Sequence, residues 1–166
     1  MEKYQAFWRR FIALIIDGLI FKPFEWLNNG IMAISPSDLI FFLWLVIWSS
    51  AGLIYTIGMH GAYGQTLGKM ITGVKVLDIS EDKLSYRQAA LRDIVPLLGW
   101  PVSIYASFQA SFGGMGFVNA FSTPAMLIYF SILFGWIILE MVTMLFNKKR
   151  RAIHDFIAGS VVVKTT

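Results

Sequence analysis

The sequence predicts an all-α membrane protein with four transmembrane helices, both termini in the cytoplasm, and a small cytoplasmic segment that forms a short β-hairpin or sheet. Three observations carry this prediction. Hydrophobic residues make up 57% of the 166 residues and charged residues only 14%, whereas soluble domains are about 45–50% apolar and about 25% charged. Long apolar stretches recur along the chain, and lysine and arginine gather in alternate connections between them. A single membrane domain over residues 1–166 is therefore expected.

Four stretches are candidates for membrane spans, since a helix needs about 20 mostly apolar residues to cross a bilayer core about 30 Å thick. The predicted spans cover residues 10–28, 39–58, 94–112 and 125–146. The second and third are uncharged, and the fourth is interrupted only by Glu140. The first is the weakest, because Asp17, Lys22 and Glu25 lie in it. Its helix either continues past Pro23 or ends there, tilted or re-entrant.

The positions of lysine and arginine predict the orientation, since cytoplasmic loops of membrane proteins are enriched in both. Thirteen of the fourteen cations lie near the N-terminus, in the loop 59–93 or in the tail 147–166, and Lys22 is the exception. The loops at about 28–38 and 113–124 contain none. Both termini and these two basic segments are therefore predicted to be cytoplasmic. Anionic lipid headgroups then account for the net positive charge, and the expected partner is the lipid bilayer rather than nucleic acid.

The two cytoplasmic segments contain signals for short elements. The apolar alternation at Val74 and Val76, and the valines at 161–163 after a glycine, are each typical of a strand. Pairing of the two would form a small sheet beside the membrane. Ser85 and Gln88 have the spacing of a capping box, which predicts a helix that starts just after Ser85.

A glycine-containing motif in the loop invites comparison with a phosphate-binding loop. The motif residues are Gly64, Gln65, Thr66, Gly68 and Lys69. Its spacing is one residue short of the phosphate loop, and Met70 stands where a Mg²⁺-binding serine or threonine is needed. The glycines therefore favour close backbone packing at the membrane surface, and no nucleotide or other cofactor is predicted.

The sequence lacks a residue set for metal binding or catalysis. There is no cysteine, and His60 and His154 are the only histidines, so one chain cannot form a three-histidine metal site. No serine stands in a nucleophile elbow with a paired base. The neighbours His154 and Asp155 are interpreted as a local hydrogen bond or helix cap. We therefore expect neither a bound metal nor an enzyme.

Charged residues within the predicted spans point to a functional path or to buried pairs, because charges at membrane depth are costly. Arg10 and Asp17 are two helical turns apart on one helix face, but about 10 Å separates their backbones. Each is therefore expected to find a partner on another helix, and Asp17 fits a functional or a structural role equally. Glu140 lies near the cytoplasmic end of its span and favours a structural role, reaching toward Lys148 or Arg150.

Four segments in chain order resemble the motifs of the RDD family of prokaryotic integral membrane proteins. They are Arg10-Phe11-x-Ala13 with Asp17, Gly64-Gln65-Thr66-Leu67-Gly68-Lys69 followed by Gly73-Val74-Lys75-Val76, the segment from Ser85 through Ala90 to Arg92-Asp93, and Arg151-Ala152-Ile153-His154-Asp155-Phe156-Ile157-Ala158-Gly159-Ser160. The family is named for one arginine and two aspartates. Arg10 and Asp17 match the first two, and Asp155 is the choice for the third, with Asp93 as the alternative.

The resemblance implies the inner membrane of a prokaryotic cell and a transport role, with monovalent cation/proton antiport proposed for some members, often as assemblies. The leading hypothesis is that the chain moves a small ion or solute as a homo-oligomer, because four spans enclose little interior. The candidate residues for a transport or structural ionic network are Arg10, Asp17, Asp93, Glu140, His154 and Asp155. In the antiport version, Asp17 exchanges a proton for Na⁺ beside the positive charge of Arg10.

A second hypothesis is a scaffold or regulator that does not transport. On this interpretation the basic segments 59–93 and 148–166 dock another membrane protein. Arg10, Asp17 and Asp155 then hold the fold together where the helices enter the cytoplasm.

Overall fold

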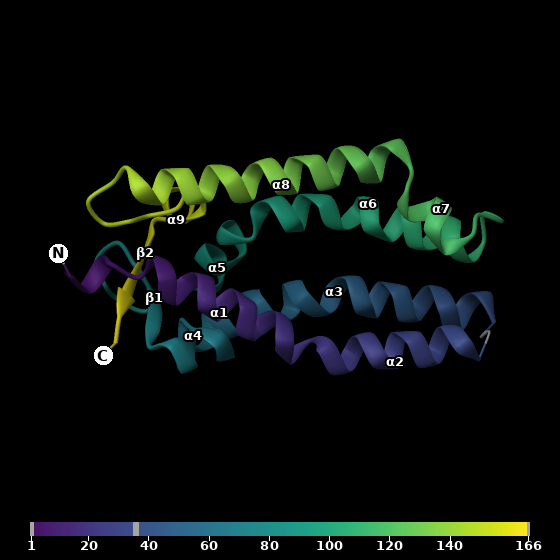
Figure 1. Cartoon of the computed structure of the whole chain (residues 1–166), viewed down its shortest axis with the longest axis horizontal. Helices are drawn as coiled ribbons and strands as arrows, with labels where there is room; N and C mark the ends of the chain where they lie inside the picture. Colours follow the sequence, from purple (N-terminus) through teal and green to yellow (C-terminus); the bar gives the residue numbers. More distant parts are fainter. Residues whose placement is uncertain (1, 35–36, 166) are drawn as a thin grey trace.

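Five helices run lengthwise in the structure, a computed structural model that describes residues 2–34 and 37–165. They are α1 (Phe7–Ile20), α2 (Lys22–Ala33), α3 (Asp38–Tyr63), α6 (Ile94–Ser111) and α8 (Pro124–Leu145). In Figure 1, α2 follows α1 and lies below α3, whereas α6 and α8 form the upper part. The predicted spans at 39–58, 94–112 and 125–146 are thus helical, and α3 extends five residues beyond its predicted end.

The shorter elements gather at one end of the molecule, which we call the sheet end. They are η1 (Glu2–Tyr4), α4 (Leu67–Thr72), β1 (Val74–Asp78), α5 (Tyr86–Arg92), α9 (Ile153–Ile157) and β2 (Ser160–Lys164). Figure 1 shows both ends of the chain here as well, while α7 (Phe117–Phe121) lies at the opposite end. The two basic segments of the sequence therefore meet at the sheet end.

Two helices replace the first predicted span. Helix α1 ends at Ile20, where the Phe21 N–H donates to the carbonyls of Gly18 and Leu19, and α2 begins at Lys22. Pro23 lies in the first turn of α2, where a residue without an N–H loses no helical hydrogen bond. The first helix thus ends before the proline, and residues 10–28 do not form one continuous helix.

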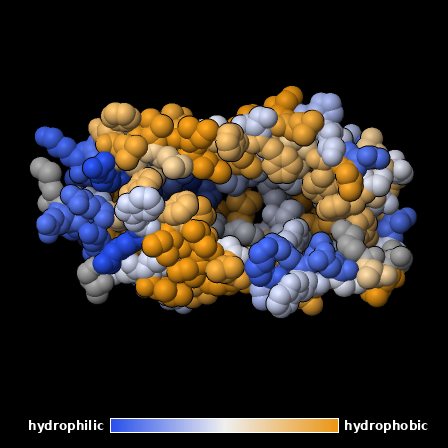
Figure 2. Space-filling view, in the orientation of Figure 1, coloured by the Kyte–Doolittle hydropathy of each residue, from blue (hydrophilic) through white to orange (hydrophobic). Residues whose placement is uncertain are grey.

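The lengthwise helices expose apolar surface. Among the described residues, α3 and α8 are long and apolar enough to cross a membrane, yet only 6% of the most apolar stretch in each is buried. A core helix of a soluble protein would be mostly buried, so this exposure favours lipid as the surroundings. Figure 2 shows hydrophobic side chains over the upper helices and hydrophilic ones at the sheet end.

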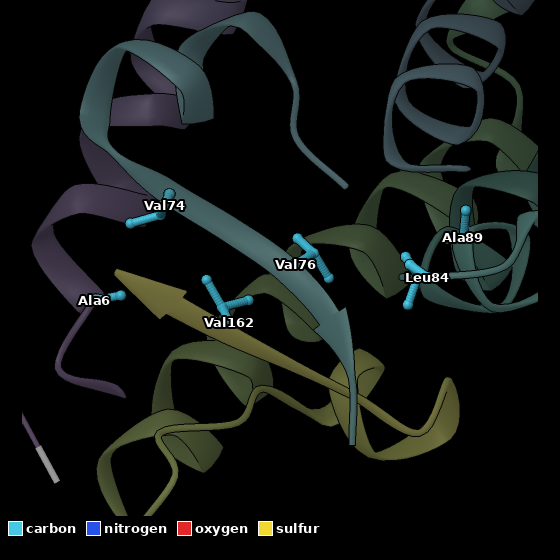
Figure 3. Packing of buried hydrophobic residues seen from close by; sticks show 6 residues of the cluster. All are labelled: Ala6, Val74, Val76, Leu84, Ala89 and Val162. Atoms are coloured by element: carbon cyan, nitrogen blue, oxygen red, sulfur yellow. The ribbon is translucent and has the colours of Figure 1, made fainter. Parts of the chain in front are cut away.

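The sheet end has its own small core. Strands β1 and β2 pair antiparallel with Val76 opposite Val162, which confirms the predicted sheet. Figure 3 shows these valines and their packed neighbours. The buried cluster consists of Ala6, Val74, Val76, Leu84, Ala89 and Val162. Residues from the start, the middle and the end of the chain thus share one core.

Helix α5 begins as the sequence predicts. The Ser85 hydroxyl accepts a hydrogen bond from the Gln88 N–H, and the Gln88 side chain accepts one from the Ser85 N–H. This reciprocal capping box fixes the start of α5. The helix carries Arg92 to its last turn, where the side chain is buried.

Candidate functional site

Asp17 joins α1 to α3 and α4. Its Oδ1 accepts hydrogen bonds from the Tyr55 hydroxyl at 2.7 Å and from the Gly68 N–H at 2.8 Å, and its Oδ2 accepts one from the Thr66 hydroxyl at 2.6 Å. Both carboxylate oxygens therefore have partners. Thr66 also caps α4 by accepting from the Lys69 N–H, so the carboxylate lies at the N-terminus of α4, where negative charge is favourable.

The glycines of the loop motif allow the close approach that the sequence predicts. A Cβ on Gly68 would lie 2.2 Å from the Ala13 carbonyl oxygen and 2.9 Å from the Asp17 carboxylate. Gly64 ends α3 with a φ of +70° and lies against the Val76 carbonyl. The Gly68 N–H thus donates to the Asp17 carboxylate of the same chain. In a phosphate loop, such an N–H would donate to a phosphate instead.

The other polar residues of the loop motif, Gln65 and Lys69, also have polar partners. The Gln65 side-chain amide donates to the Val74 carbonyl at 2.9 Å, which ties the loop to β1. The Lys69 Nζ lies 2.5 Å from the His60 Nε2. The loop motif therefore connects α1, α3 and the sheet.

Asp155 is the centre of a second cluster, in which two arginines surround one fully buried carboxylate. Arg10 donates to Oδ2 at 2.9 Å and Arg92 donates to Oδ1. The Ala152 N–H donates to Oδ2 at 2.9 Å, which is the local helix cap that the sequence predicts. Burial raises the pKa of the Asp155 carboxyl, but the charges of Arg10 and Arg92 outweigh this and hold the pKa well below its ordinary value.

Glu140 and His154 complete this Asp155 cluster. The His154 Nε2 lies 3.2 Å from a nitrogen of Arg10 and 2.9 Å from one of Arg92. A guanidinium can only donate, so Nε2 accepts and the Nδ1–H donates to Glu140. The expectation that Glu140 reaches toward Lys148 or Arg150 is therefore wrong: α9 folds back beside α8 and brings His154 to it instead.

Arg10 and Asp17 belong to different clusters. Each finds its partners on other elements, which confirms the expectation from their spacing. The guanidinium of Arg10 extends to Asp155 and to the Arg150 carbonyl at 3.3 Å. Arg10 therefore binds Asp155 and not Asp17, so the structure does not support a direct action of Arg10 on Asp17.

Two residues of these clusters have no role in the sequence-based predictions. Arg92 supplies half of the positive charge around Asp155, and a buried arginine at a helix end needs a carboxylate. Its burial cannot be inferred from local sequence, however. Tyr55 is an aromatic residue within an uncharged apolar stretch, where tyrosine is not distinctive.

Asp93 lies at a groove between the lengthwise helices. Ser49, Gly52, Leu53, Thr56, Asp93, Pro96, Trp100, Ser103 and Tyr129 line this Asp93 groove of about 300 Å³, and Figure 2 shows the surface hollowed between the lower and upper helices. The Asp93 Oδ2 is buried and has no hydrogen-bond partner among the described residues. Burial raises the pKa of the Asp93 carboxyl, against opposing effects of the Thr56 hydroxyl and the Arg92 charge. Of the three aspartates, Asp93 alone thus has a carboxylate oxygen without a partner.

Exposed apolar helices and a polar end rich in cations define a membrane-associated protein. The model of the RDD family matches residues 4–159. The chain therefore belongs to the RDD family, as its four motifs indicate. No curated protein and no solved structure matches it.

Proposed function

We propose that the chain is a protein of a prokaryotic inner membrane with four transmembrane segments and cytoplasmic termini, and that it moves a small monovalent cation as a homo-oligomer. The distribution of lysine and arginine supports the orientation, and the meeting of both basic segments at the sheet end is consistent with it. Neither a catalytic role nor a bound cofactor is part of the proposal.

The observation that carries the transport proposal is that Asp93 lines the groove and has a buried carboxylate oxygen without a hydrogen-bond partner among the described residues. Ser49 and Ser103 line the same groove, and small hard cations prefer oxygen ligands such as carboxylates. Asp17 is a poorer candidate, since three donors already occupy its two oxygens. We therefore assign to Asp93 the transport role that the sequence suggests for Asp17.

The test is Na⁺-driven proton flux in proteoliposomes that contain the full chain. Asp93→Asn is expected to reduce the flux to that of empty vesicles, because the amide cannot neutralise a cation. Asp82→Asn is the matched control, since that carboxylate lies on an exposed turn, and it should transport like the wild type. Equal flux in the wild type and Asp93→Asn would refute the proposed role of Asp93.

A regulator without transport remains the second candidate, and the closed Asp155 cluster favours it. Two arginines, a serine and a helix N-terminus satisfy that carboxylate, as expected of a group that holds a fold. Crosslinking in native membranes that recovers one stoichiometric membrane protein, together with flux no greater than in empty vesicles, would select this function over transport.

A further inference from the structure

The buried His60 and the half-buried Lys69 form a pair beside the Asp93 groove. His60 lies on α3 one helical turn beyond Thr56, which lines the groove. Lys69 comes from α4, and its Nζ lies 2.5 Å from the His60 Nε2. The other ring nitrogen, Nδ1, is buried and has no hydrogen-bond partner among the described residues. Neither cluster described above uses this pair.

Because the two nitrogens lie so close together, they share one proton, and the pair can carry at most one positive charge. An ammonium group has no lone pair, so a charged Lys69 must donate to an unprotonated His60 Nε2. If Lys69 is neutral, one proton still lies between the two nitrogens and the pair carries no charge. Two interacting groups of this kind titrate as a unit. The pair therefore changes between one positive charge and none.

Charges from several elements face the pair. Arg10 on α1, Arg92 on α5, and His154 and Asp155 on α9 all act on it, as does Asp93 before α6. Burial, together with the positive charges of Arg92 and Arg10, lowers the pKa of Lys69 to about 7, and the negative charge of Asp93 opposes this shift. The charge of Asp93 thus helps Lys69 to keep its proton.

We propose that the His60–Lys69 pair releases one proton when a cation binds at Asp93 and takes it up again when the cation leaves. This inference rests on the proposed function. A cation at Asp93 cancels the negative charge that favours the Lys69 ammonium. The Lys69 ammonium then loses one proton to water while a remaining N–H still donates to the His60 Nε2, so that one positive charge enters and one departs.

Proton release on addition of NaCl tests the inference, with the full chain in detergent and a pH-indicator dye in weak buffer. Choline chloride controls for ionic strength, and ²²Na⁺ binding is measured on the same samples. At about pH 6.5 the wild type should release up to about three quarters of a proton for each bound Na⁺, because that fraction of the pairs is charged, and at about pH 9 none, because the pair is then already neutral. Lys69→Met should bind Na⁺ without releasing protons, while the exposed control Lys83→Met should behave as the wild type.

The possible failures are distinguishable. Na⁺ binding with undiminished proton release in Lys69→Met would overturn this inference and leave the transport proposal standing. A wild type that binds no Na⁺ would overturn both. Should Lys69→Met not fold, the ¹⁵Nζ resonance of Lys69 in the wild type gives the answer at about pH 6.5. A shift toward the neutral amine on Na⁺ addition supports the inference, and an unchanged resonance refutes it.

Discussion

At the residue scale, the carboxylates of Asp17, Asp93 and Asp155 differ in what surrounds them. Asp155 has two arginines, Asp17 has two hydroxyls and a backbone N–H, and Asp93 has a buried oxygen without a partner among the described residues. Buried polar groups are normally hydrogen-bonded, and those that are not call for an explanation. The environments thus separate two aspartates whose oxygens all have partners from one with a buried oxygen that has none among the described residues.

Asp155→Asn is expected to destabilise the protein strongly, because it leaves the charges of Arg10 and Arg92 buried without a carboxylate. Removing one partner of a buried ion pair costs about 3–5 kcal/mol. Unfolding in mixed micelles with increasing sodium dodecyl sulfate measures the loss. Asp82→Asn should unfold like the wild type, and a similarly unchanged midpoint for Asp155→Asn would contradict a structural role for the Asp155 cluster.

The same cluster predicts a dependence of stability on pH. The pKa of Asp155 is lower in the folded protein than in the unfolded chain, so its contribution is complete above a pH of about 4 and is lost as the pH falls from there through the folded value. The unfolding midpoint of the wild type should therefore drop below about pH 4 more than that of Asp155→Asn. Parallel curves for the two proteins would contradict this assignment.

The sequence identifies some of these residues and misses others for physical reasons. Arg10, Asp17 and Asp155 stand out because charges are rare in an apolar chain or because they lie in a motif. The pairing of Arg10 with Asp155 spans 145 positions, so spacing along one helix could not reveal it. The absence of a partner for the buried oxygen of Asp93 among the described residues depends on how the helices pack, which no local pattern encodes.

At the scale of elements, the short elements follow local rules and the first helix does not. The capping box of α5 and the valines of β1 and β2 are complete signals in themselves. Pro23 indicates a boundary nearby, but it fits equally at the start of a helix or after the end of one. Only the hydrogen bonds of Phe21 show that α1 ends before the proline.

Contact between α1 and α4 depends on Gly68, and Gly68→Ala should separate them. The new Cβ would lie 2.2 Å from the Ala13 carbonyl oxygen, so the backbone of α1 or α4 would have to move. Such overpacking costs about 1–3 kcal/mol or more. Folded yield by fluorescence-detected gel filtration should fall. Gly58→Ala is the matched control, since a Cβ there would meet nothing within 4 Å, and an equal loss in that variant would contradict the close-contact role of Gly68.

At the scale of the whole molecule, the exposed apolar helices follow from composition, and the polar sheet end follows from the positions of the lysines and arginines. With 57% hydrophobic residues the chain cannot bury all of its apolar surface. Composition cannot test the proposed homo-oligomer, because a helix face that contacts another subunit and one that contacts lipid look alike in sequence. The groove at Asp93 likewise requires the complete arrangement of α3, α6 and α8.

The proposed topology has a direct test, because the chain contains no native cysteine. Single cysteines at Lys83 on the sheet end and at Val118 on α7 would be probed with a membrane-impermeant maleimide in spheroplasts. Val118 is 73% exposed, and Val118→Cys should react in intact spheroplasts. Lys83→Cys should react only after lysis, and the reverse pattern would invert the proposed orientation.

The pairing of Arg10 and Arg92 with Asp155 also means that this cluster can form only late in synthesis. Both arginines and all the lengthwise helices precede Asp155 and β2 in the chain, and polypeptides generally fold from the N-terminus as they emerge from the ribosome. Until α9 and β2 are translated, two guanidinium groups lack their carboxylate and β1 lacks its neighbour. A nascent chain stalled before Asp155 would therefore expose an unfinished sheet end, which the cell's proteases can recognise.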